Sequence, residues 1–218
     1  MERWRKVEGG FLHAFFFTFT MMRSSLNFIL CLAATAAAST NQANIYDESA
    51  ATLNVQLSQA SYCADPQALM PSDSLIVTSI LEDDAGLLNG GRAIVGCDTA
   101  NRSLFVAYRG SSNLENWLDN MKFRKINPYA SNESVYVERG FWLWYQSLKA
   151  NVDAALLSAI TDARCTDAGA QPFPSPAPVS VTGHSAGAAV ATLQAYDLVN
   201  GDAAGTKGAL ALTTVYTL

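Results

Sequence analysis

PVSVTGHSAG, residues 178–187, is the stretch that decides the fold. Its first half is apolar and typical of a strand, and a run of small residues typical of a helix follows it. Between the two stands the pattern Gly-x-Ser-x-Gly, with Ser185 at its centre. This is the sequence form of a nucleophile elbow, a sharp strand-to-helix turn that lifts a serine to the edge of a sheet.

The residues around Ser185 suit such a turn. Gly183 and Gly187 are expected because a strained turn and close helix–strand packing leave no room for a Cβ atom. The helix N-terminus would point its free amides at the serine, where negative charge develops during acyl transfer. His184 is adjacent to the serine, and neighbouring side chains on a tight turn point in different directions. We therefore expect His184 to pack or to make a structural hydrogen bond.

A second constellation lies at residues 105–112, where an apolar strand ends in the small polar loop Arg109-Gly110-Ser111-Ser112. The segment after it has the spacing of an amphipathic helix. Such a helix beside a catalytic loop can act as a lid whose apolar face turns towards lipid. The alternative is an ordinary short helix packed on the core. The apolar lid face consists of Leu114, Trp117, Leu118 and Met121.

The rest of the chain alternates strands and helices, which predicts an α/β fold with a mostly parallel sheet covered on both sides. The largely apolar run at residues 103–108 predicts a strand that is buried on both faces, as in the middle of such a sheet. The expected strands are residues 75–81, 91–97, 103–108, 178–182 and 209–216, and the expected helices are residues 50–60, 141–160 and 186–200.

Several ordered motifs together resemble the class 3, or fungal-type, lipase family. They cover residues 45–218, and their order and approximate spacing agree with that family. The motifs are Ser61-Tyr62-Cys63, Tyr108-Arg109-Gly110-Ser111-Ser112, Asn116-Trp117-Leu118-x-Asn120, Arg139-Gly140-Phe141 and Val181-Thr182-Gly183-His184-Ser185.

The resemblance implies an α/β-hydrolase that cleaves acylglycerols or related carboxylic esters. By matching motif, Ser185 resembles the nucleophile, and Ser111 resembles the oxyanion-hole residue at the lid hinge. The backbone amide of Ala186 would be the second oxyanion donor. Residues 112–121 resemble the lid. The family more often has Leu and Gly where this chain has Ala186-Gly187-Ala188, a change that keeps the amide donor.

The remaining members of a triad are not evident in the sequence. The family order is Ser, Asp, His, with both partners on later loops. The chain has two histidines, His13 and His184. Asp197 is on the elbow helix and is expected to face solvent. We therefore interpret the chain as an incomplete α/β-hydrolase fold, running through the elbow and the next strand, which is inactive by itself.

The N-terminal residues 1–38 are typical of a leader. A positive n-region, a short apolar run and small residues before a cleavage site predict secretion, with Met21 or Met22 as the true start. An uncleaved N-terminal membrane anchor is the alternative. In either case, residues 39–218 would be the partial lipase-like domain.

Secretion would place the chain in an oxidising compartment, which makes its cysteines disulfide candidates. Three cysteines remain once the leader is removed: Cys63, Cys97 and Cys165. Candidate glycosylation sites are Asn101 and Asn132.

The composition and the motifs of the chain argue against several classes of function. The net charge of -5 disfavours nucleic-acid binding. No metal-ligand cluster or phosphate-binding glycine loop is visible, so we predict neither a metal nor a cofactor. The expected partners are a lipid or ester substrate and the lipid–water interface. Two alternatives stay open: a carboxylesterase of the feruloyl-esterase type in the same family, and a non-catalytic secreted lipid-binding relative.

Overall fold

The computed structural model describes residues 47–83, 91–111, 124–129, 134–166, 172–200, 206 and 208–218. Several predictions lie outside these residues. They are the leader, His13, the lid residues Leu114, Trp117, Leu118 and Met121, and the second sequon at Asn132.

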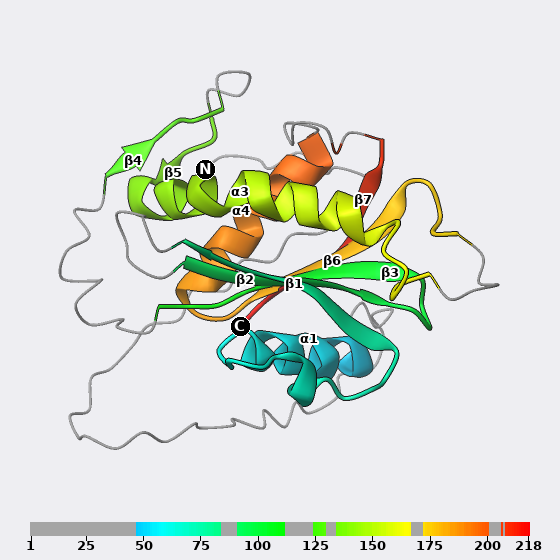
Figure 1. Ribbon diagram of the computed structural model, residues 1–218. Coiled ribbons are helices and arrows are strands. Elements are labelled where there is room, and N and C mark those ends of the chain that lie inside the picture. Colours follow the sequence, from blue (N-terminus) through cyan, green and yellow to red (C-terminus); the bar gives the residue numbers. More distant parts are fainter. Residues whose placement is uncertain are drawn as a thin grey trace, which may run out of the picture. The chain divides into compact units, whose positions relative to one another are not determined.

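A five-stranded sheet has the order β1-β2-β3-β6-β7 (Figure 1). β1 and β2 run antiparallel, as do β2 and β3, whereas β3–β6 and β6–β7 are parallel pairs. Each of these strands was predicted to within about two residues. The strands are β1 (Leu75–Asp83), β2 (Gly91–Asp98), β3 (Ser103–Tyr108), β6 (Ala177–Gly183) and β7 (Leu210–Thr217).

The prediction of a mostly parallel sheet was wrong, because half of the strand pairings are antiparallel. The reason lies in the connections. The short turn at residues 99–102 joins β2 to β3 directly, which only antiparallel neighbours allow. A long helix connects β3 to β6 (α3) and another connects β6 to β7 (α4), and these crossovers allow the two pairs to be parallel.

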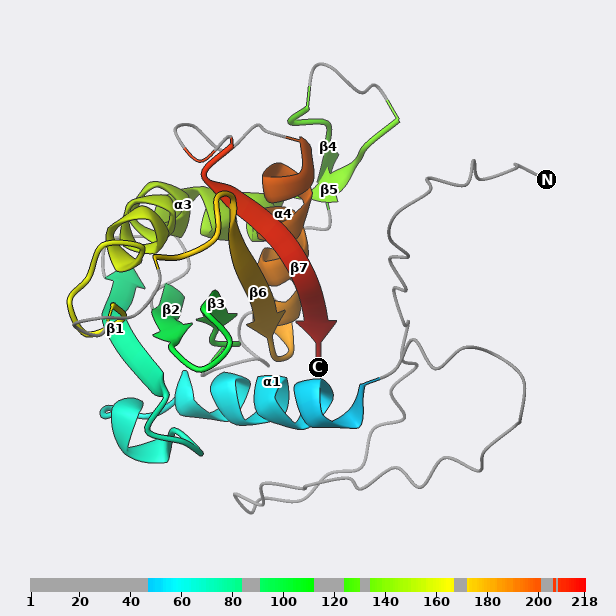
Figure 2. The same ribbon diagram turned by 90° about the vertical axis from the view of Figure 1, so that its right-hand side faces the viewer.

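Helices cover both faces of the sheet (Figure 2), as predicted. α1 (Glu48–Ala60) packs on one face, and α3 (Arg139–Ala159) and α4 (Ala186–Asn200) pack on the other. The carboxylate of Asp47 caps α1 by accepting from the amides of residues 49 and 50. The small elements are a 3₁₀ turn η1 (Gln67–Leu69) and the pair β4 (Lys125–Ile126) and β5 (Val137–Glu138).

The core lies on both sides of β2, which is buried at all eight positions. β3 is buried at every position but its first, which confirms that its apolar run marks a strand covered on both faces. One cluster fills the space between the sheet and the two helices α3 and α4, and it includes Val106, Leu148 and Val190. A smaller cluster under α1 includes Leu57 and Ile94. The sheet that carries the elbow is therefore fixed from both faces.

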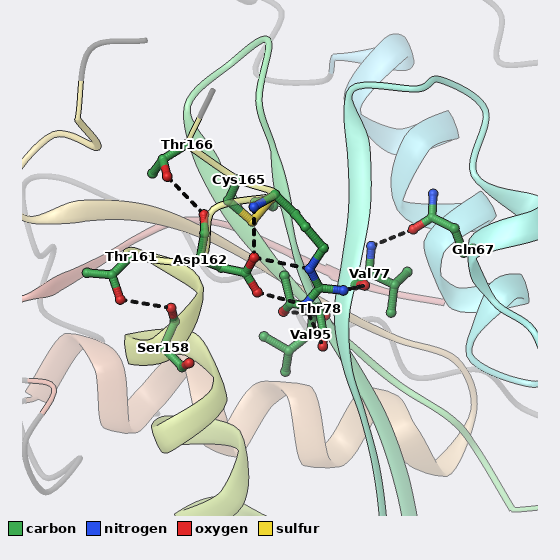
Figure 3. A network of polar contacts seen from close by, with 11 residues as sticks. Gln67, Val77, Thr78, Val95, Ser158, Thr161, Asp162, Cys165 and Thr166 are labelled. Carbon is green, nitrogen blue, oxygen red and sulfur yellow. Dashed lines mark hydrogen bonds and ion pairs between the residues drawn. A yellow bond between two sulfur atoms is a disulfide. The ribbon is translucent and has the colours of Figure 1, made fainter. Parts of the chain in front are cut away.

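A disulfide and a polar network fasten the loop after α3 to β1 and β2. Cys97 on β2 is bonded to Cys165, and Cys63 is a free, partly buried thiol. Beside the disulfide, the Arg164 guanidinium donates to Val77 O and Thr78 O, where β1 has a bulge (Figure 3). These contacts cover backbone groups at the exposed edge of the sheet, which would otherwise pair with another strand.

Within the described ranges, no helix is both long and apolar enough to cross a membrane.

Candidate active site

Ser185 lies at the point where β6 ends and α4 begins, as the Gly-x-Ser-x-Gly pattern predicts. Its φ of 56° is in the left-handed region, which a residue with a side chain rarely adopts. Strained backbone of this kind persists only where surrounding structure holds it, and it is concentrated at functional sites. The side chain is partly exposed and is not enclosed in the core. This is the geometry of a serine presented at the edge of a sheet.

The two glycines of the pattern are required by close backbone contacts. A Cβ atom at Gly183 would lie 2.3 Å from Gly187 O, and one at Gly187 would lie 2.4 Å from Tyr108 O. Both contacts are with backbone atoms, so neither is relieved by a side chain turning away. The first holds the strand against the helix across the turn. The second holds the helix against the end of β3.

The loop after β3 lies directly beside the elbow. Tyr108 and Gly183 are paired in the parallel register, so β3 and β6 end side by side. A Cβ atom at Gly110 would lie 2.6 Å from His184 O and 3.2 Å from the Cβ of Ser185. The loop predicted to carry the oxyanion hole is therefore packed against the predicted nucleophile. Ser111, at the end of this loop, is partly buried.

The start of α4 presents backbone donors beside the serine. The amide of Gly187 donates to His184 O at 2.9 Å, and the amide of Ala188 donates to Ser185 O at 3.0 Å. Of these first three amides, only that of Ala186 has no backbone acceptor within the part of the chain described. An amide at a helix N-terminus is a favourable partner for developing negative charge.

His184 makes a structural hydrogen bond, as expected from its position on the turn. Its Nδ1 lies 2.9 Å from the hydroxyl of Tyr62, and the two rings meet edge to face. The same hydroxyl accepts from the amide of Gly110 at 2.9 Å. Partial burial lowers the pKa of His184, which is therefore neutral near pH 7.

This arrangement agrees with a comparison of the sequence with known families. The sequence model described as Lipase (class 3) matches residues 105–218, from β3 through the elbow to the last strand. The chain belongs to the class 3 lipase family. The matched region holds the predicted oxyanion loop, the predicted lid and Ser185.

Individual relatives support the membership of this chain in the class 3 lipase family. A secreted mono- and diacylglycerol lipase of Fusarium solani is 34% identical over 124 residues, covering 56% of this chain and 32% of the relative. A lipase of Rhizomucor miehei is 28% identical over 119 residues, covering 55% of this chain and 30% of the relative. This class 3 chain thus spans about a third of the length of these curated relatives.

Solved structures give the same fold. The Rhizomucor miehei triacylglyceride lipase superimposes with a TM-score of 0.56 at 22% identity, covering 78% of this chain and 60% of that one. The mono- and diacylglycerol lipase of Aspergillus oryzae also gives 0.56 at 22% identity, covering 70% and 57%. At these identities the likeness concerns the fold, which is that of an α/β-hydrolase.

Between α3 and α4 of this lipase-family chain lies a buried polar network that the sequence did not predict. Asp197, expected to face solvent, is only 1% exposed. It accepts from the hydroxyls of Tyr129 at 2.8 Å and Tyr145 at 2.5 Å, and Lys149 lies 3.3 Å away. The expectation was wrong because α4 is covered by α3 on the side of Asp197, so the carboxylate meets donors there rather than water.

The network continues to the end of β3. Lys149 also pairs with Asp153 at 2.8 Å, one helical turn further along α3. The other oxygen of Asp153 accepts from Gln194, whose own side-chain oxygen accepts from Tyr108 at 3.0 Å. Tyr108 immediately precedes the predicted oxyanion loop. The i,i+4 spacing of Lys149 and Asp153 was the one sequence signal for this network.

We expect the stability of the chain to fall as the pH rises above about 10, the ordinary pKa of tyrosine. Burial raises the pKa of Tyr145, and the hydrogen bond and negative charge of Asp197 raise it further. Above pH 10 the unfolded chain loses this proton while the folded chain keeps it. The free energy of unfolding then falls by about 1.4 kcal/mol per pH unit for each such tyrosine.

Tyr145→Phe tests this expectation. At pH 7 the variant should be less stable by about 2 kcal/mol, because Asp197 loses a donor. Its alkaline slope should nevertheless be shallower than that of the parent chain, since one protected phenol is gone. Urea unfolding between pH 7 and 11 measures both quantities. Tyr136→Phe is the control, because Tyr136 is 63% exposed. Equal alkaline slopes in all three proteins would contradict the argument.

The structure thus brings Ser185, Gly183, Gly187, the Ala186 amide and the loop ending at Ser111 to one place. The sequon at Asn101 lies on an exposed turn, where its amide donates to Asp98 at 2.7 Å, and glycosylation there stays a prediction. Among the described residues no cluster of His, Cys, Asp and Glu is arranged to hold a metal ion.

Proposed function

We propose that this class 3 lipase chain is built for serine ester hydrolysis of the triacylglycerol lipase type, with Ser185 as the acyl-accepting nucleophile. One observation carries the proposal: the left-handed backbone at Ser185, between β6 and α4, with the loop at Gly110 packed on it. The amide of Ala186 and the residue Ser111 would then receive the oxyanion.

The family supports the class of reaction. One related structure, at 23% identity and a TM-score of 0.53, is that of a triacylglycerol lipase whose catalytic centre is formed by a serine protease triad. In such a triad a histidine takes the proton of the serine. His184 has its Nδ1 beside Tyr62, so it is a poor candidate for that base. We propose that the chain by itself does not complete a triad.

Secretion is part of the proposal. The bond between Cys97 and Cys165 is of the kind that persists in oxidising compartments. The Fusarium solani and Penicillium camembertii relatives are secreted lipases. Residues 1–38 would be the leader, and a lipid–water interface would be the place of action, with residues 112–121 as the lid.

Adduct formation with an alkylboronic acid tests the nucleophile without requiring turnover. The serine oxygen donates an electron pair to boron, its proton passes to solvent, and a tetrahedral anion resembling the acyl-transfer intermediate results. We expect ¹¹B NMR to show tetrahedral boron with the parent chain and to lose that signal with Ser185→Ala. Ser49→Ala, at the exposed start of α1, is the matched control.

The choice of probe separates the alternatives. Tighter binding of octylboronic acid than of phenylvinylboronic acid would support a lipase, and the reverse order would point to an esterase of the feruloyl type. No tetrahedral signal with either probe would contradict a competent Ser185. Vesicle binding equal in the parent chain and in Ser185→Ala would then favour the non-catalytic lipid-binding relative.

A further inference from the structure

Tyr62 joins three parts of the site that are far apart in the sequence. It follows the C-terminal end of α1, outside the segment that the family model matches. Its hydroxyl lies 2.9 Å from the amide of Gly110 on the oxyanion loop and 2.9 Å from Nδ1 of His184 on the elbow. These two contacts span 48 and 122 residues of sequence. Although Tyr62 is 40% exposed, its hydroxyl makes two hydrogen bonds within the protein.

The amide of Gly110 is a donor, so the oxygen of Tyr62 accepts there. The direction of the bond to His184 depends on the tautomer of the histidine. We assign the single proton of the phenol to this bond, which makes Nδ1 the acceptor and places the histidine's own proton on Nε2. Burial raises the pKa of Tyr62, although the Gly110 bond and nearby Arg109 lower it, so the phenol keeps its proton at neutral pH.

The contact has a consequence for the loop. Gly110 is enclosed between Tyr62, which a Cβ atom there would approach to 2.4 Å, and the backbone oxygen of His184 at 2.6 Å. The hydrogen bond fixes the peptide unit between Arg109 and Gly110. The next residue, Ser111, is the predicted oxyanion donor. A small rotation of this peptide would change the position of Ser111 relative to Ser185.

We propose that Tyr62 is a positioning residue that holds the oxyanion loop against the nucleophile elbow through the Gly110 amide and His184. This inference rests on the proposed function of Ser185. Tyr62 is not a catalytic residue, because both of its hydrogen bonds go to protein groups other than Ser185. It differs from a packing residue in acting through its hydroxyl alone.

Tyr62→Phe removes that hydroxyl and keeps the ring. We expect the variant to bind octylboronic acid about tenfold more weakly, less than the loss from deleting an oxyanion donor outright. Its urea unfolding should remain close to that of the parent chain, because the position is partly exposed. Tyr136→Phe, at a more exposed tyrosine, should change neither quantity.

Two NMR measurements report on the contact directly. In the parent chain, the ¹⁵N shifts of His184 should show an acceptor at Nδ1 and a proton on Nε2, and the Gly110 amide should exchange slowly. In Tyr62→Phe the histidine should become a mixture of tautomers, and the Gly110 amide should exchange faster. These signals also test the contact if the variant is less stable than expected.

The outcomes separate this inference from the proposed function. Equal boronic acid affinity in Tyr62→Phe and the parent chain would overturn the positioning role while leaving Ser185 as the nucleophile. Absence of any adduct with the parent chain would overturn the proposed function instead. In that case, an unchanged His184 tautomer and an unchanged exchange rate of the Gly110 amide in Tyr62→Phe would overturn the positioning role of Tyr62 as well.

Discussion

Ester hydrolysis by the purified chain should be on the order of 10⁶-fold slower than hydrolysis by a class 3 lipase with a complete triad, the loss typical when a serine nucleophile lacks its base. His184 is the one histidine among the described residues, and its Nδ1 is bonded to Tyr62. Asp197, near the C-terminal end of α4, is held by two tyrosines and Lys149, so it is not free to orient a base.

Release of p-nitrophenol from a butyrate ester measures this rate, with the Fusarium solani relative as the reference. A fast burst that Ser185→Ala abolishes would contradict the prediction and show that the chain has a working base. In that event His13→Ala and His184→Ala would identify which of the two histidines supplies it. A slow rate that is the same in Ser185→Ala agrees with the prediction.

Gly183→Ala should destabilise the chain by about 3 kcal/mol or more, because the new methyl group overlaps backbone and not a movable side chain. The Cβ atom would lie 2.3 Å from Gly187 O and 2.5 Å from Gly187 C. Relief would require β6 and α4 to separate at the turn that presents Ser185. The variant should therefore lose boronic acid binding together with stability.

Urea unfolding measures the first effect, and Gly208→Ala is the matched control. Gly208 has a φ of 80° but nothing within 4 Å of an added Cβ atom, so its substitution should cost only about 1 kcal/mol. Similar midpoints for the two variants would show that close contact at the elbow is not what requires glycine at 183.

The sequence was sufficient for the local features of the site. The strand, the turn and the helix around Ser185 could each be predicted because their signals are short-range: an apolar run, two glycines and a run of small residues. The same holds for β3, whose predicted bounds, residues 103–108, are those observed. The position of the oxyanion loop beside the elbow was predictable only through the family resemblance, since no spacing rule joins residues 110 and 185.

The polar contacts across the fold could not be predicted in this way. Asp197 lies on a helix of mostly small and apolar residues, where a carboxylate is equally compatible with solvent and with a buried partner, and only the packing of α3 on α4 decides between them. The short turn at residues 99–102 already implies the antiparallel β2–β3 pair, whereas the parallel pairs depend on which strands meet after the crossovers. The pairing of Cys97 with Cys165 was likewise left open by three cysteines.

The sequence by itself determined that a serine stands on a strand-to-helix turn, because turn geometry and glycine sterics act over a few residues. The tertiary structure alone decided what surrounds that serine. It placed Tyr62 between Gly110 and His184, and it buried Asp197 among tyrosines. Hydrogen bonds between residues 48 to 122 positions apart follow from how layers pack, and no local pattern records that packing.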